Sequence, residues 1–232
     1  MARKGTVGIM TTTYGHSRED VRRWPDDPAV RRTLEEYLDK FPAGARAVES
    51  LLNGGGLDFT GADLSGLDLS EAEFSEANLS GVSLAGADLS GAWMIGAVLR
   101  GADLSQCNLR KAQGRACDAQ GAILRGANLQ RSEFEDADFR RADFREAWFG
   151  KTSFTGADFR GADLRRCLFG EAGSRTGLTQ ARLADCQVEG ARGTVSSPVD
   201  VGTDSPQLID GAAVQRWFAD RGAPLVEVWR SA

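Results

Sequence analysis

The sequence is poor in the residues from which catalytic and metal sites are usually built. Its 232 residues include one histidine, His16, and four cysteines, none of them in Cys-x-x-Cys spacing. A Gly-x-x-x-x-Gly-Lys phosphate loop is missing, and the carboxylates are spread along the chain rather than gathered at one point. We therefore predict no enzyme activity, no bound metal and no cofactor.

Long apolar runs are also missing. No stretch of 18 apolar residues occurs, so no transmembrane helix and no membrane contact are predicted. The first residues carry basic side chains without the apolar core of a secretory signal. We predict a cytoplasmic protein with reduced thiols, because free cysteine packs as a small apolar residue. The four cysteines are Cys107, Cys117, Cys167 and Cys186.

What the sequence does have is a period of five. A large apolar residue recurs at every fifth position from Phe59 to Phe169, except at Gly114 and Ala119. A small residue precedes it by two positions, and glycine is common two positions after it. Helices repeat about every 3.6 residues and strands about every two, so neither explains the pattern. We predict that each repeat is one side of a square, with glycine at the corners and coils about 4.8 Å apart.

Two irregularities interrupt this pattern. Gly114 and Ala119 are consecutive inward positions without bulk, so we expect the rod to narrow or bend there, with Met94 or Phe134 leaning into the space. After residue 172 the register slips by one residue, and the repeats then continue to about residue 193. On that count Cys167 and Cys186 lie one coil apart on the same side.

The repeats resemble a known family. The stretches "GADLSGLDLS", "GANLQ", "DADFRRADFR" and "TGADFRGADL" are similar to the A-[DN]-[LF]-x-x signature of pentapeptide-repeat proteins, and the likeness extends over residues 57–193. The resemblance implies an all-β solenoid, a right-handed quadrilateral parallel β-helix. It implies less about function, because one fold serves many functions.

Four segments are predicted. Residues 1–25 show no period and form a mobile N-terminal segment. Residues 26–56 form a helical N-terminal cap, with one helix starting at Asp27 and Pro28 and a second, short helix over 42–56. The apolar stripe of the first helix covers the open coil, or alternatively binds a partner. The stripe consists of Val30, Leu34, Tyr37, Leu38 and Phe41.

Residues 57–193 form the β-helix, and residues 194–232 form a linker followed by a small helix-and-strand unit. The linker is predicted from composition over residues 194–207. The terminal unit acts as a C-terminal cap. The family resemblance adds the alternative of a homodimer through this end, with Trp217, Phe218 and Trp229 as the contact.

Charge is distributed unevenly along the repeats. Residues 57–99 hold seven acids and no Lys or Arg, whereas residues 100–193 hold 13 acids and 16 bases. The outward residues Arg140, Arg145, Arg160 and Arg165 each follow an Asp by two positions. We predict a lattice of Arg–Asp pairs on a solvated surface; a phosphate-binding face is the alternative.

The resemblance also implies a function. Some pentapeptide-repeat proteins imitate a DNA duplex and bind type II topoisomerases, chiefly DNA gyrase. We predict a DNA mimic that binds or protects such an enzyme, and so confers resistance to a topoisomerase poison, without touching nucleic acid itself. An acidic rod suits a basic, DNA-binding saddle. The predicted acidic face consists of Asp58, Asp63, Asp68, Glu71, Glu73, Glu76 and Asp88.

Two observations favour an alternative. The later coils are rich in arginine, and no loop insertion interrupts the repeats of the kind that quinolone-resistance members use to engage gyrase. The alternative is a generic protein-interaction scaffold, whose contact surface is formed by outward apolar side chains. These are Trp93, Ile95, Trp148 and Leu168.

Overall fold

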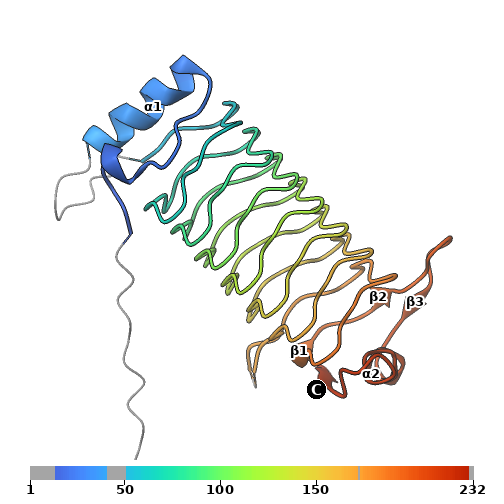
Figure 1. Ribbon diagram of the computed structural model, residues 1–232. Coiled ribbons are helices and arrows are strands. Elements are labelled where there is room, and N and C mark those ends of the chain that lie inside the picture. The colour runs from blue at the N-terminus through green and yellow to red at the C-terminus, as the bar shows by residue number, and fades with distance from the viewer. Residues whose placement is uncertain (1–13, 41–50, 172, 230–232) are drawn as a thin grey trace, which may run out of the picture.

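The computed structural model describes residues 14–40, 51–171 and 173–229 (Figure 1). A stack of coils forms a rod, with helix α1 (Pro28–Asp39) across its first coil and helix α2 (Ala212–Ala219) at the opposite end. A short 3₁₀ helix, η1 (Arg18–Asp20), precedes α1. Residues 42–50 of the second helix predicted over 42–56 lie outside the described residues. The described part, 51–56, is not helical, because Asn53 already bridges to Glu73 as part of the first coil.

The coils pair through parallel backbone bridges 20 residues apart. Four columns of bridges run along the rod, which gives it four sides. We call the sides wall 1 to wall 4. The columns start at Asp58↔Asn78 for wall 1, Asp63↔Ser83 for wall 2, Asp68↔Asp88 for wall 3 and Asn53↔Glu73 for wall 4. The bridges are isolated rather than part of longer strands, because the chain turns a corner every five residues. The right-handed sense of the coil stays a prediction.

The large residue of each repeat fills the inside of the rod. Phe139 and Phe159, one coil apart, are stacked with ring centroids 5.4 Å apart and planes 19° from parallel, as the period predicts. Neighbours within a coil meet edge-on, as in Phe139 and Phe144 at 4.9 Å. Such pairs stabilise a core by about 0.5–1.5 kcal/mol beyond simple burial.

The bulk missing at Gly114 is supplied by the next coil. A Cβ placed on Gly114 would lie 2.1 Å from Cε1 of Phe134, so the Phe134 ring occupies that space. The bridges Gln113↔Glu133 and Asp118↔Asp138 keep the 20-residue spacing through this region. The prediction that Phe134 leans in is therefore confirmed, and the coil register is unbroken. That the rod narrows or bends there stays a prediction.

The irregularity after residue 169 is an insertion of four residues rather than a lost residue, so the expectation that no insertion interrupts the repeats is wrong. Ser153 pairs with Gly177 and Leu168 pairs with Arg192, so this coil has 24 residues instead of 20. Inserting four residues and deleting one residue shift a five-residue repeat to the same phase, so the sequence pattern does not distinguish them. The predicted stacking of Cys186 on Cys167 is wrong for this reason. The amide of Gln187 instead pairs with the carbonyl of Ala162, which places Cys186 over Ala162.

The N-terminal part of the chain is attached to the first coil. Asp27 caps α1, its side chain accepting a hydrogen bond from the amide of Ala29, as predicted. Val30, Leu34, Tyr37 and Leu38 are buried, and the Tyr37 hydroxyl donates to the carbonyl of Asp68 at 2.6 Å. The predicted stripe is confirmed for these four residues, and Phe41 lies outside the described residues.

The prediction of a mobile segment over residues 1–25 does not hold for its second half. Gly15 pairs with Leu67 on wall 3, and Arg23 pairs with Asp63 on wall 2. Backbone groups of the first coil that no preceding coil satisfies are bonded in this way. Residues 1–13 lie outside the described residues.

Residues 194–207 are not a linker. Strand β1 (Arg192–Val195) pairs in parallel with β4 (Leu225–Val228), and β2 (Val199–Asp200) pairs with β3 (Leu208–Ile209). Val195 and Asp200 also bridge to Thr176 and Arg182 of the last coil. A composition rich in Ser, Thr and Pro suggested a linker, but free backbone groups on the last coil give these residues partners.

Helix α2 and strand β4 confirm the predicted helix and strand of the C-terminal unit. Val214, Trp217 and Phe218 of α2 are buried, and the Phe218 ring lies 5.8 Å from that of Phe169. Trp217 and Phe218 are therefore occupied within the chain, whereas Trp229 is 45 % exposed. That these end units act as caps, and that the chain forms a dimer, stay predictions. No helix among the described residues is long and apolar enough to cross a membrane.

Candidate functional site

The seven acids predicted as one face are spread around the rod. Asp58 lies on wall 1, Asp63 on wall 2, and Asp68 and Asp88 on wall 3. Each of these four aspartates accepts a hydrogen bond from the amide two residues later, as in Ser65 to Asp63 at 3.1 Å. They are part of the turn that ends each side of the coil, so their carboxylates have a structural role.

The three glutamates differ from the aspartates in position, because they gather on wall 4, although the Glu73 carboxylate also accepts a hydrogen bond from the amide two residues later, that of Ser75 at 2.6 Å. Glu73 lies on the wall, and Glu71 and Glu76 occupy the corners on either side of it. Both corner residues are exposed and adopt left-handed backbone angles, with φ of 59° and 61°. Neither carboxylate has a hydrogen bond or ion pair to another described residue. The left-handed region costs a non-glycine residue about 1–2 kcal/mol, so the two glutamates are held there against a backbone preference for glycine.

Wall 4 places an apolar patch directly beside these glutamates. Trp93 lies one coil after Glu73 and pairs with it, and Trp93 is 50 % exposed. Ile95, two residues further on, is 43 % exposed. Gly91 and Gly96, at the corners of the same coil, leave room for the glutamate side chains. A Cβ on Gly91 would lie 3.2 Å from Cγ of Glu71. We call Glu71, Glu73, Glu76, Trp93 and Ile95 the wall 4 patch.

The other predicted apolar pair lies on the neighbouring wall. Trp148, 50 % exposed, pairs with Leu168 on wall 3, and Leu168 is half-buried. Ile123 on wall 2, 40 % exposed, is a further outward apolar residue that sequence reasoning missed. Its signal was an apolar residue in the position before the large one, where the repeats normally carry Asp, Asn or Glu.

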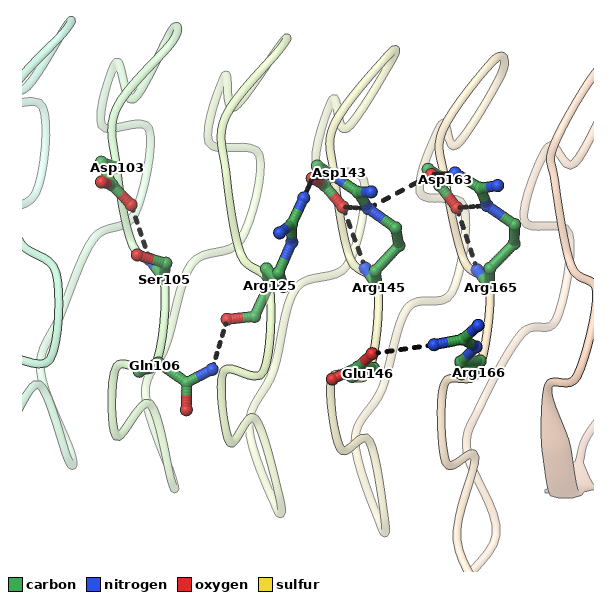
Figure 2. Close-up of polar contacts among 10 residues, drawn as sticks. All are labelled: Asp103, Ser105, Gln106, Arg125, Asp143, Arg145, Glu146, Asp163, Arg165 and Arg166. Atoms are coloured by element: carbon green, nitrogen blue, oxygen red, sulfur yellow. Dashed lines mark hydrogen bonds and ion pairs between the residues drawn. The ribbon is translucent and has the colours of Figure 1, made fainter.

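The predicted Arg–Asp lattice is confirmed on walls 1 and 2. The guanidinium groups of Arg140, Arg160 and Arg165 each donate to both carboxylate oxygens of the Asp two residues earlier, with shortest distances of 2.6 Å and 2.9 Å. Arg145 binds Asp143 in the same way and also reaches Asp163 of the next coil at 3.4 Å (Figure 2). Because each guanidinium already has a carboxylate partner, this surface is not a free phosphate-binding face.

The lattice shifts the proton affinity of its carboxyls. Partial burial opposes ionisation of Asp138, but the hydrogen bonds from Arg140 outweigh it and lower the pKa. In the same way, burial opposes ionisation of Asp163, but the hydrogen bonds from Arg165 outweigh it and lower the pKa of Asp163. Burial raises the pKa of Asp143, with help from the neighbouring charge of Asp163. On wall 1, hydrogen bonds from the Thr60 hydroxyl and amide lower the pKa of Asp58.

The cysteines belong to the core, as predicted. All four are buried and free. Burial raises the pKa of Cys107 and Cys117 to about 12, and the Cys107 thiol donates to the carbonyl of Leu84 at 2.8 Å. No group of three or more His, Cys, Asp or Glu side chains that would hold a metal occurs within residues 14–40, 51–171 and 173–229.

The geometry defines a class of protein. It is a four-sided solenoid of five-residue repeats that presents side chains on flat walls. The family model for pentapeptide repeats matches residues 58–94, 92–131 and 132–170, with 8 copies. The chain belongs to the pentapeptide repeat family.

Solved structures of the same family are similar to this chain. Full-length QnrB1, described as a plasmid-mediated fluoroquinolone resistance protein, is 21 % identical with a TM-score of 0.56; the match covers 64 % of this chain and 76 % of QnrB1. A thylakoid-lumen pentapeptide repeat protein of Arabidopsis thaliana is 32 % identical, over 48 % of this chain and 68 % of that one, with a TM-score of 0.35. HetL of Nostoc sp. strain PCC 7120, involved in regulating heterocyst differentiation, is 23 % identical with a TM-score of 0.31; the match covers 71 % of this chain and 95 % of HetL. No curated protein matches the sequence.

Proposed function

We propose that the protein is a non-enzymatic, cytoplasmic binding protein whose wall 4 patch docks on a basic, DNA-binding surface of a type II topoisomerase such as DNA gyrase. The fold likeness to QnrB1, a fluoroquinolone resistance protein, supports this target class. In this proposal the bound rod occupies part of the path of DNA and protects the enzyme from a poison.

The observation that carries the proposal is the composition of the wall 4 patch. Three carboxylates in one coil border a half-exposed tryptophan in the next. Tryptophan is enriched among the residues that dominate binding energy, and charges at the rim steer the partner. Arg23 of the N-terminal segment pairs with Asp63 on wall 2, whereas Glu71 and Glu76 at the corners of wall 4 have no ion pair with a described residue.

The test is a pair of matched double variants. Glu71→Lys with Glu76→Lys reverses both corner charges of the patch. Asp136→Lys with Asp185→Lys makes the same charge change at exposed corners in later coils, with φ of 57° and 60°. Exposed substitutions of this kind usually change stability by about 0.5 kcal/mol or less. We expect the first variant alone to lose protection of gyrase supercoiling against a quinolone, and the wild-type effect to weaken as salt rises.

Two results would count against this proposal. If a large excess of the wild-type protein changes neither gyrase supercoiling nor its inhibition by a quinolone, gyrase is not the target. If both double variants act like wild type, the acidic corners do not make the contact.

A generic protein scaffold is the second candidate, and the exposure of Trp93 favours it. In that case Trp93→Ala removes the contact while reversal of Glu71 and Glu76 has little effect. Affinity purification with wild-type and Trp93→Ala protein, compared by mass spectrometry, separates a topoisomerase from other partners.

A further inference from the structure

Two groups of cations stand out in the later coils, the arginines on walls 1 and 2 and the cations at one corner of the rod. The arginines on wall 1 are bound to carboxylates, and so are those on wall 2 (Figure 2). A second group stands at the corner between walls 3 and 4 in four consecutive coils, and none of its side chains forms an ion pair with another described residue. We call this group the basic ridge. It consists of Lys111, Arg131, Lys151 and Arg175.

The ridge is continuous along the rod. The amide of Lys111 bonds to the coil of Arg131, the amide of Arg131 to the coil of Lys151, and the amide of Lys151 to the carbonyl of Arg175. Neighbouring cations therefore follow each other at the coil spacing of about 4.8 Å. All four side chains are exposed. Arg110 precedes the ridge, and two acids, Glu133 and Glu171, flank it, so positive charge dominates this edge.

Three of these cations occupy positions that favour glycine. Lys111, Arg131 and Lys151 have φ of 60°, 63° and 64°, whereas the same corner one coil earlier carries Gly91 at 70°. A non-glycine residue there costs about 1–2 kcal/mol. Because no ion pair with a described residue offsets this cost, the fold itself gains little from the charges.

Aromatic side chains and hollows border the ridge on both sides. On wall 3, Trp148 lines a pocket of about 430 Å³ whose floor includes Gly150 and Gly170. Between Lys151 and Arg175 lies a second hollow of about 350 Å³. The Arg175 guanidinium covers the ring of Trp229 at 3.9 Å. Trp148 and Trp229 are 50 % and 45 % exposed.

We propose that the basic ridge binds single-stranded nucleic acid, with the phosphates along the four cations and a base stacked on Trp148, while the Trp229 ring holds the Arg175 guanidinium in the row. A row of cations alone would attract any polyanion. Half-exposed aromatics beside the row favour single-stranded nucleic acid over an acidic peptide, because bases stack on aromatic rings and carboxylate side chains do not. The ridge lies on later coils than the wall 4 patch, so this activity is separate from topoisomerase binding.

The experiment uses the full chain and a fluorescein-labelled oligothymidylate of about 16 nucleotides, the upper size of a typical single-strand site. Fluorescence anisotropy gives the association constant at several salt concentrations. Four phosphate contacts predict a slope of log K against log salt of about −2.8, from about −0.7 per phosphate on single strands. Arg131→Gly with Lys151→Gly is expected to bring the slope to about −1.4. Trp148→Ala is expected to weaken binding about fivefold or more.

The matched control is Arg141→Gly with Arg166→Gly. These two residues have φ of 60° at other corners, so the control removes the same charge from the same backbone conformation. Arg166, unlike the ridge residues, also pairs with Glu146 at 3.4 Å. It is expected to keep the wild-type slope, and thermal melting is expected to show that both glycine variants remain folded. Equal loss of affinity in the two double variants would refute the ridge, as would an absence of binding at low salt. Equal binding of duplex DNA, or poly-glutamate binding that Trp148→Ala leaves unchanged, would refute a single-stranded ligand.

Discussion

Gly114→Ala should destabilise the rod, although alanine normally suits such a position. The backbone of Gly114 does not have a positive φ, so alanine brings no left-handed strain. Replacing glycine by alanine at a compatible site usually stabilises a protein by about 0.4–1 kcal/mol. Here the added Cβ would lie 2.1 Å from Cε1 and 2.4 Å from Cδ1 of Phe134.

The Phe134 ring has little freedom to give way. It meets Phe139 edge-on at 5.5 Å and stacks on Phe154 at 6.1 Å. Overpacking of a filled core costs about 1–3 kcal/mol, which exceeds the entropic gain. For a chain of this length about 1 kcal/mol corresponds to about 2–4 °C in melting temperature. We therefore expect the melting temperature of Gly114→Ala to fall by several degrees.

A double variant and a control make this test specific. Gly114→Leu with Phe134→Leu restores the common inward residue in both coils, and it should be more stable than the sum of the two single changes predicts. Residues in contact couple by about 0.5–3 kcal/mol. Gly55→Ala is the control, because the nearest atom to its Cβ would be 3.5 Å away. If thermal unfolding followed by circular dichroism shows Gly114→Ala to be as stable as wild type, Phe134 does not fill the space as described.

Two further predictions concern titration. The thiols of Cys107 and Cys117, with pKa raised by burial to about 12, should not react with Ellman's reagent at pH 8 in the native protein and should react fully in guanidinium; rapid native labelling would contradict their burial. A carboxyl whose folded-state pKa lies below its unfolded value stabilises the fold above the unfolded pKa of about 3.9, and loses this contribution as pH falls through the folded-state pKa. The pKa values of Asp58, Asp138 and Asp163 are lowered in the folded state, whereas the pKa of Asp143 is raised. We therefore expect the melting temperature to decrease as the pH is lowered past about 4. The double variant Arg140→Gln with Arg165→Gln should show a smaller decrease. An unchanged melting temperature at pH 3 would contradict this prediction.

Within the repeats, the sequence alone determined most of the architecture. One large residue per five fixes which side chains point inward, and four sides per coil make residue i+20 the neighbour of residue i. Counting alone therefore placed Trp148 beside Leu168 and paired Arg140 with Asp138. The gap at Gly114, and Phe134 as one residue able to fill it, followed from the same count.

The tertiary structure decided what lies beyond strict repetition. An insertion of four residues and a deletion of one give the same phase in a five-residue pattern, so only backbone pairing showed that the coil containing residue 172 has 24 residues. Residues 14–23 and 194–200 gain their structure from unpaired backbone groups on the end coils, a long-range effect that local composition does not encode. The division of the acids had a similar origin. Hydrogen bonds to neighbouring amides gave the aspartates a structural role, and the corner geometry left Glu71 and Glu76 exposed beside Trp93.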